Sequence, residues 1–140
     1  MATGTHVLFP WNDTYEVHVG VVDSQHKVLV GIVNDLHQAM VSGHGKDQLG
    51  KILTNLITYT KGHFNTEEQM MQQKGYPDYA RHKAEHDNLT KTVLDFQKKF
   101  QANEVGLTLE VMNFLKDWLG KHIMESDKRL GAFMGQHGVH

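Results

Sequence analysis

The chain has no cysteine among its 140 residues. Disulfides, thiolate metal sites and iron–sulfur clusters are therefore excluded, and the absence fits a reducing compartment, so a cytoplasmic location is expected. No apolar stretch approaches the roughly 20 residues that a membrane-spanning helix needs. The N-terminal sequence lacks a basic region followed by a long apolar run, and no secretory signal is expected.

The chain also lacks a strong excess of either charge. A formal net charge of -2 gives no electrostatic reason to expect nucleic acid or an anionic membrane as a partner. A chain of 140 residues can bury a sizeable core without covalent staples, so one domain spanning 1–140 is expected. The helix exteriors carry mixed charges, which favours a monomer. Only two prolines are present, Pro10 and Pro77, and this scarcity favours a helical protein.

Apolar residues recur at helical spacing in four segments, which predict helices over roughly 23–41, 47–74, 79–102 and 108–130. Asp23 and Ser24 offer N-cap chemistry for the first helix. Gly75 and Pro77 end the second, since they provide a left-handed cap and a residue that cannot continue a helix. Four amphipathic helices with short connections pack most simply as an all-α, up-down-up-down antiparallel bundle, here preceded by an irregular N-terminal segment.

Histidine is unusually frequent, with 11 copies, and several lie on the apolar seams of the predicted helices. Desolvating even a neutral polar group without a partner costs roughly 2–7 kcal/mol, so such residues need something that satisfies them. The pairs His63/Glu67 and His82/His86 have i, i+4 spacing, which places each pair on one helix face. A pair of metal ions is the economical shared partner. The candidate ligands are His26, His63, Glu67, His82, His86, His122 and Asp127.

Each of these signals is weak when taken alone. An isolated His/Glu pair is usually a surface contact, and His26 alone resembles an ordinary core histidine. Asp127 lies five residues after His122, about 140° around an ideal helix, and reaches the site only if the helix unwinds locally or the carboxylate leans across. Geometry alone favours Glu125 or a solvated role for Asp127. Surface positions are expected for His6, His18, His37, His44, His137 and His140.

The number and type of ligands restrict the metal. A structural zinc site uses four ligands, fewer than the set available here. Nitrogen and oxygen ligands with imidazole in the majority suit iron, copper, nickel or zinc. Two octahedral ions with two bridging carboxylates and an oxo or hydroxo bridge would leave one coordination position open for a small ligand.

An ordered set of motifs resembles the hemerythrin family, specifically the single-domain bacterial hemerythrins (bacteriohemerythrins). The set comprises Trp11-Asn12 with Tyr15, Asp23-Ser24-Gln25-His26-Lys27, His63-Phe64 with Glu67-Glu68, His82-x-x-x-His86, and Trp118-Leu119-x-x-His122-Ile123-x-x-x-Asp127. The resemblance extends from Trp11 to about Leu130. It, rather than helical geometry, supports Asp127 as a ligand.

The resemblance implies reversible dioxygen binding, for carriage, storage or delivery, at two iron ions joined by an oxo or hydroxo bridge. His82, His86 and His122 would hold one iron, and His26 and His63 the other. Glu67 and Asp127 would bridge the two. Dioxygen would be held as a hydroperoxide on the iron with the open position, in an apolar pocket that hinders proton delivery. The corresponding pocket residues are Leu29, Phe64, Trp118, Leu119 and Ile123.

Other functions remain alternatives at this point. A di-iron oxidase or peroxidase is one, but bundle enzymes of that kind rely on carboxylates and Glu-x-x-His pairs, whereas imidazole predominates here. Binding is therefore favoured over catalysis, and the protein is not expected to be an enzyme. An oxygen or redox sensor would need a separate partner. The partners expected are dioxygen and, for a delivery role, an oxygen-consuming enzyme.

Overall fold

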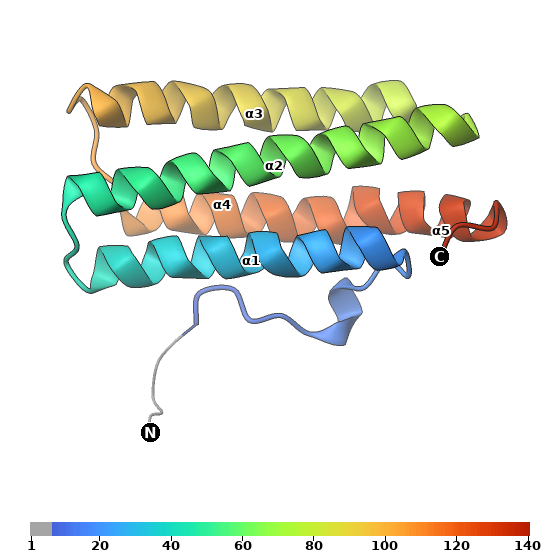
Figure 1. Cartoon of the computed structure of the whole chain (residues 1–140), viewed down its shortest axis with the longest axis horizontal. Helices are drawn as coiled ribbons and strands as arrows, with labels where there is room; N and C mark the ends of the chain where they lie inside the picture. Colours follow the sequence, from blue (N-terminus) through green and yellow to red (C-terminus); the bar gives the residue numbers. More distant parts are fainter. Residues whose placement is uncertain (1–6) are drawn as a thin grey trace.

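The chain forms a bundle of four antiparallel helical rods in a computed structural model that describes residues 7–140 (Figure 1). Consecutive helices run in opposite directions, which confirms the predicted up-down-up-down fold. The last rod has three parts, because a π-helical turn interrupts it. The elements are α1 (Gly20–Val41), α2 (Lys46–Lys74), α3 (Tyr79–Gln101), α4 (Leu109–His122), the π-helix η2 (Ile123–Asp127) and α5 (Lys128–Gln136).

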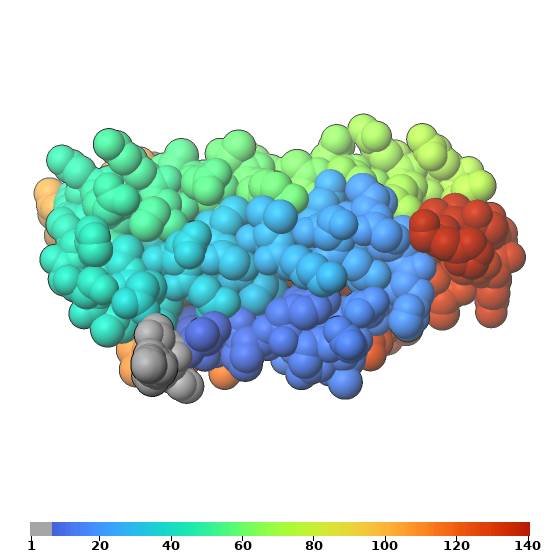
Figure 2. Space-filling view, turned by 60° about the horizontal axis from the view of Figure 1, so that its bottom comes forward, coloured from blue at the N-terminus to red at the C-terminus, as the bar shows by residue number. Residues whose placement is uncertain are grey.

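The N-terminal segment, residues 7–19, is irregular except for the short 3-10 helix η1 (Asp13–Tyr15), and it lies against the bundle beside α1 (Figure 2). The backbone N–H of Phe9 donates to Asn34 Oδ1 at 2.8 Å, and Asn34 Nδ2 donates back to the Phe9 carbonyl at 2.9 Å. The Phe9 ring is buried and lies against α4 at Gly120. The segment is therefore part of the core, although it forms no long helix.

The first and last helices differ from the predicted boundaries. Helix α1 begins at Gly20, three residues before the expected start. The Asp23 carboxylate accepts from the backbone N–H groups of Val17 at 2.8 Å and His18 at 3.1 Å, so it holds the preceding turn rather than capping the helix. The last rod continues past the expected end at Leu130, because the chain stays helical through η2 and α5 to Gln136.

Most histidines expected at the surface are exposed, but His37 is a correction. Its side chain is buried on α1, with 8% of its surface exposed. His6 lies outside the described residues. None of the helices within residues 7–140 is long and apolar enough to cross a membrane.

Candidate metal centre

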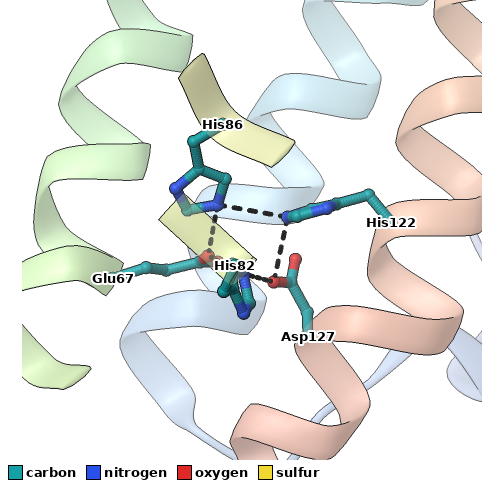
Figure 3. A group of neighbouring side chains, drawn as sticks. All are labelled: Glu67, His82, His86, His122 and Asp127. Atoms are coloured by element: carbon teal, nitrogen blue, oxygen red, sulfur yellow. Dashed lines mark hydrogen bonds and ion pairs between the residues drawn. The ribbon is translucent and has the colours of Figure 1, made fainter. Parts of the chain in front are cut away.

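The predicted ligands meet in the interior of the bundle as two overlapping groups. Each group draws its potential ligand atoms to within 4.8 Å of one another, and every member is buried. Figure 3 shows the larger group, to which α2, α3, α4 and η2 contribute. The larger group contains Glu67, His82, His86, His122 and Asp127, and the smaller contains His26, His63, Glu67 and Asp127.

The two shared carboxylates divide their oxygens between the histidine groups. Glu67 Oε1 lies 3.1 Å from His86 Nε2, whereas Glu67 Oε2 lies 2.8 Å from His63 Nε2. Asp127 Oδ1 lies 3.0 Å from His82 Nε2, and Asp127 Oδ2 lies 2.8 Å from His26 Nε2. One oxygen toward each group is the arrangement that a bridging carboxylate requires.

The π turn brings Asp127 to the same helix face as His122. A π-helix closes i→i+5 bonds, so residues five apart, which diverge in an α-helix, align across η2. His122 Nε2 consequently lies 3.3 Å from Asp127 Oδ1. The π turn is therefore the local unwinding of the helix that Asp127, five residues after His122, needed in order to reach the site. Glu125, which ideal geometry favoured, is instead exposed and lines a cleft on the outside of the bundle.

Most polar atoms at the centre of the cluster have no hydrogen-bond partner. Both oxygens of Glu67 and of Asp127 are buried and unpaired, as are the Nε2 atoms of His26, His63 and His82. These groups lie close together, yet their mutual orientation does not form hydrogen bonds. Unpaired burial costs several kcal/mol per group, and converging imidazole and carboxylate donors suit a transition-metal ion. The residues therefore fit a bound cation pair.

Charge at the cluster also favours a cation. Burial by itself would lower the pKa of His26, but the close, negatively charged carboxylates of Asp127 and Glu67 raise it to about 9. The same two carboxylates overcome burial to raise the pKa of His82 to about 10. Burial and the charge of Glu67 would raise the pKa of Asp127, but His122 and His26 hold it well below its usual range. The carboxylates are therefore ionised, and without metal they attract protons onto the imidazoles.

Three further side chains contact the histidines at Nδ1, on the side of each ring that faces away from the cluster. No role was predicted for them from the sequence. Gln25 Oε1 lies 2.7 Å from His63 Nδ1. Glu68 Oε2 lies 3.0 Å from His86 Nδ1, and Glu85 Oε1 lies 2.8 Å from His122 Nδ1. Such contacts turn Nε2 toward the cluster and fix the ring orientation. Each of the three directly neighbours a predicted ligand in the chain, which is the signal that could have identified them.

The predicted pocket residues occupy different surroundings. Leu29, Phe64 and Leu119 line an internal cavity of about 30 Å³. Ile123 is fully buried. Trp118 instead lines an outer cleft of about 380 Å³ and stacks on the His122 ring, with centroids 4.6 Å apart and planes 14° apart. The pocket assignment stays a prediction.

The fold and the cluster together define a class, namely helical-bundle proteins that hold cations through buried histidines and carboxylates. The sequence profile of the Hemerythrin HHE cation binding domain matches residues 17–133. The chain therefore belongs to the hemerythrin family, and its histidine–carboxylate cluster is a cation site of the type typical of a hemerythrin di-iron centre.

Individual relatives agree with this membership. A bacteriohemerythrin of Methylococcus capsulatus is 44% identical over 117 residues, which are 84% of this chain and 88% of that protein. A myohemerythrin of Theromyzon tessulatum is 28% identical over 119 residues, 85% of this chain and 88% of that protein. The crystal structure of a wild-type hemerythrin matches with a TM-score of 0.87 and 41% identity, covering 91% of this chain and 98% of that one.

Proposed function

We propose that this protein binds dioxygen reversibly at a pair of iron ions. The observation that carries the proposal is the division of each shared carboxylate between a group of three histidines and a group of two. His82, His86 and His122 would hold one ion, and His26 and His63 the other. Glu67 and Asp127 would bridge them. Unequal histidine numbers on chemically similar ions leave the two-histidine side with a position for a small ligand.

The side chains around this position keep it dry. The internal cavity lies one helical turn from the ligands, since Leu29 follows His26 by three residues and Leu119 precedes His122 by three. Phe64 lies over His86, with ring centroids 3.8 Å apart. An apolar wall excludes water and slows proton delivery, which favours intact release of the ligand. The iron pair would supply the electrons with which dioxygen is bound and returned.

The ligand set favours binding over oxidation chemistry. Di-iron enzymes built on helical bundles use a carboxylate from each of two helices plus a Glu-x-x-His motif from each of the other two. Here five imidazoles, which are neutral ligands when they bind a metal, accompany two carboxylates. Fewer anionic ligands give less stabilisation to highly oxidised iron, and this difference favours a carrier.

Visible absorption of the iron-reconstituted protein tests the proposal. The protein is reduced without oxygen, exposed to air and then purged with an inert gas. We expect a visible band that appears with oxygen and disappears on purging. Zinc-loaded protein is the control, since zinc has no redox chemistry and should show no band. A band that never forms, or an oxidised spectrum that purging cannot reverse, would contradict reversible binding.

A further inference from the structure

An open groove on the surface and the internal cavity share part of their walls. The groove, of about 300 Å³, lies between α3 and α4, and Phe96, Val111 and Phe114 form most of its apolar lining. Val93 and Leu115 line both the groove and the internal cavity. These two side chains, each 8% exposed, are therefore the partition between solvent and the interior.

The cavity extends from this partition toward the metal cluster, and one of its lining residues, Phe64, stacks on the ring of His86. At its inner end it reaches Leu29, Phe64 and Leu119, which are close in sequence to the ligands on α1, α2 and α4. Its one hydroxyl group, on Thr60, donates to the Leu56 carbonyl at 2.7 Å and so is already satisfied. On a measure by which one water needs roughly 10–15 Å³, a cavity of about 30 Å³ admits a diatomic molecule.

Helices α3 and α4 are loosely packed against each other along the seam that holds the groove. These two helices approach each other less closely than α1 approaches α2 or α2 approaches α3. The partition consists of two side chains, and a change of rotamer at either one would widen the gap between them. No backbone hydrogen bond needs to break.

The outer cleft beside His122 is a poorer path for an apolar gas. Charged side chains line it, including Arg81, Lys121 and Arg129, and the stacked rings of Trp118 and His122 form its floor. Dioxygen cannot compete with water for such groups, whereas transfer of an apolar solute from water into apolar surroundings is favourable.

We propose that dioxygen reaches the metal centre through the groove between α3 and α4, passing between Val93 and Leu115 into the internal cavity. This inference rests on the proposed function, because it assigns the path of the same ligand. The partition sets the barrier to passage without changing the site at either end. Its size should therefore alter the rates of binding and release together and leave the equilibrium affinity nearly unchanged.

Substitutions at Leu115 test the path by flash photolysis and stopped-flow measurement on the iron protein. Leu115→Ala should raise both the association and the dissociation rate constants, and Leu115→Phe should lower both, each by roughly tenfold, equivalent to about 1.4 kcal/mol of barrier. Leu94→Phe adds the same ring at an exposed position on α3 outside both cavities and should leave the rates unchanged. Val93→Phe narrows the partition from the other helix and replaces Leu115→Phe if that variant does not fold.

A second measurement does not depend on oxygenation of the iron. In the zinc-loaded protein, dissolved dioxygen is paramagnetic and speeds nuclear relaxation of nearby methyl groups. Methyl NMR should show this effect at Leu115, Leu29 and Leu119 in the wild type, and Leu115→Phe should weaken it at the inner two while Val111 keeps it. Equal relaxation at the methyl groups of Leu29 and Leu119 in both proteins would overturn the path. Association and dissociation rate constants equal to those of the wild type, in every Leu115 variant that still forms the oxygenated state, would also overturn it. If no protein forms that state, the proposed function fails, and the relaxation data still decide the path.

Discussion

The histidines of the centre are held by neighbouring helices in a repeated pattern. Gln25 of α1 contacts His63 of α2, and Glu68 of α2 contacts His86 of α3. Glu85 of α3 continues the pattern to α4 at His122, and it also accepts from the Ser126 hydroxyl at 2.6 Å. The anionic partners both lie on the side with three histidines, so this side has the more electron-donating imidazoles.

Glu85→Gln tests this contribution at the scale of one residue. The amide retains the size of the side chain and can still accept from His122 Nδ1, but it removes the charge. Because outer partners of metal-bound histidines are worth about 10–100-fold in affinity, we expect the lower end of that range, roughly a tenfold weaker zinc affinity in a chelator competition. Glu125→Gln, in the same outer cleft, is the control. Equal affinities in the two variants would assign Glu85 no role in holding the metal.

At the scale of elements, the interruption of the last rod is the feature on which the centre depends. If Ile123–Asp127 were α-helical, Asp127 would turn away from His122 and the second shared carboxylate would be missing. The π turn keeps the rod continuous, so α5 still packs on the bundle.

Asp127→Asn tests the carboxylate that the π turn delivers. The amide keeps the shape but loses an anionic oxygen, so we expect fewer than two metal ions per chain and a lower melting temperature of the metal-loaded protein. Elemental analysis after gel filtration measures the stoichiometry. Asp117→Asn, an exposed change on α4, is the matched control. Two tightly bound ions in Asp127→Asn would exclude it as a bridge.

A close approach between α5 and the N-terminal segment gives a second prediction for elements. A Cβ at Gly131 would overlap the Val17 carbonyl oxygen, whereas one at Gly135 would meet no atom closer than 3.9 Å. Gly131→Ala should therefore destabilise the protein by a few kcal/mol through backbone displacement. Gly135→Ala should be neutral or stabilise by roughly 0.5–1 kcal/mol, since alanine favours the helix. Chemical denaturation measures the free energy of unfolding of both variants. Equal values would show that the N-terminal segment moves away from residue 131 without loss of stability.

At the scale of the whole molecule, the cluster involves all four helical rods, because α1, α2, α3 and the α4–η2 rod each contribute buried histidines or carboxylates to it. Its charged and polar atoms occupy the middle of the bundle, where a continuous apolar core would otherwise form. The bundle without metal therefore contains a destabilised centre, and metal-binding energy is also folding energy.

Metal removal should consequently lower the stability of the entire bundle. Free metal at a thousand times its dissociation constant adds about 4 kcal/mol to the free energy of unfolding, and we expect a clearly higher melting temperature with zinc than after chelation. His82→Ala should show a low melting temperature and little response to zinc. An equal melting temperature with and without metal in the wild type would contradict the coupling.

Sequence periodicity was sufficient for the bundle and for most of the cluster. His26, His82 and His86 lie on apolar seams, and a seam residue faces the core wherever the helix is regular. Periodicity was insufficient where the backbone departs from an ideal helix. Asp127 is the clearest example, because a π turn is set by packing at both of its ends and has no strong local code. The early start of α1 has a similar cause, since Asp23 was free to cap its own helix and instead caps the preceding turn.

The amino-acid sequence by itself determined the four helical rods, most of their buried residues and the types of side chain in the cluster, because these follow from composition and from spacing along one chain. Tertiary structure alone decided the relations between chain segments. It paired Glu85 with His122, placed Trp118 on the outer cleft and left a cavity that shares Leu115 with a surface groove. Such contacts depend on how helices far apart in sequence rotate and pack against one another, which no periodicity within a single helix specifies.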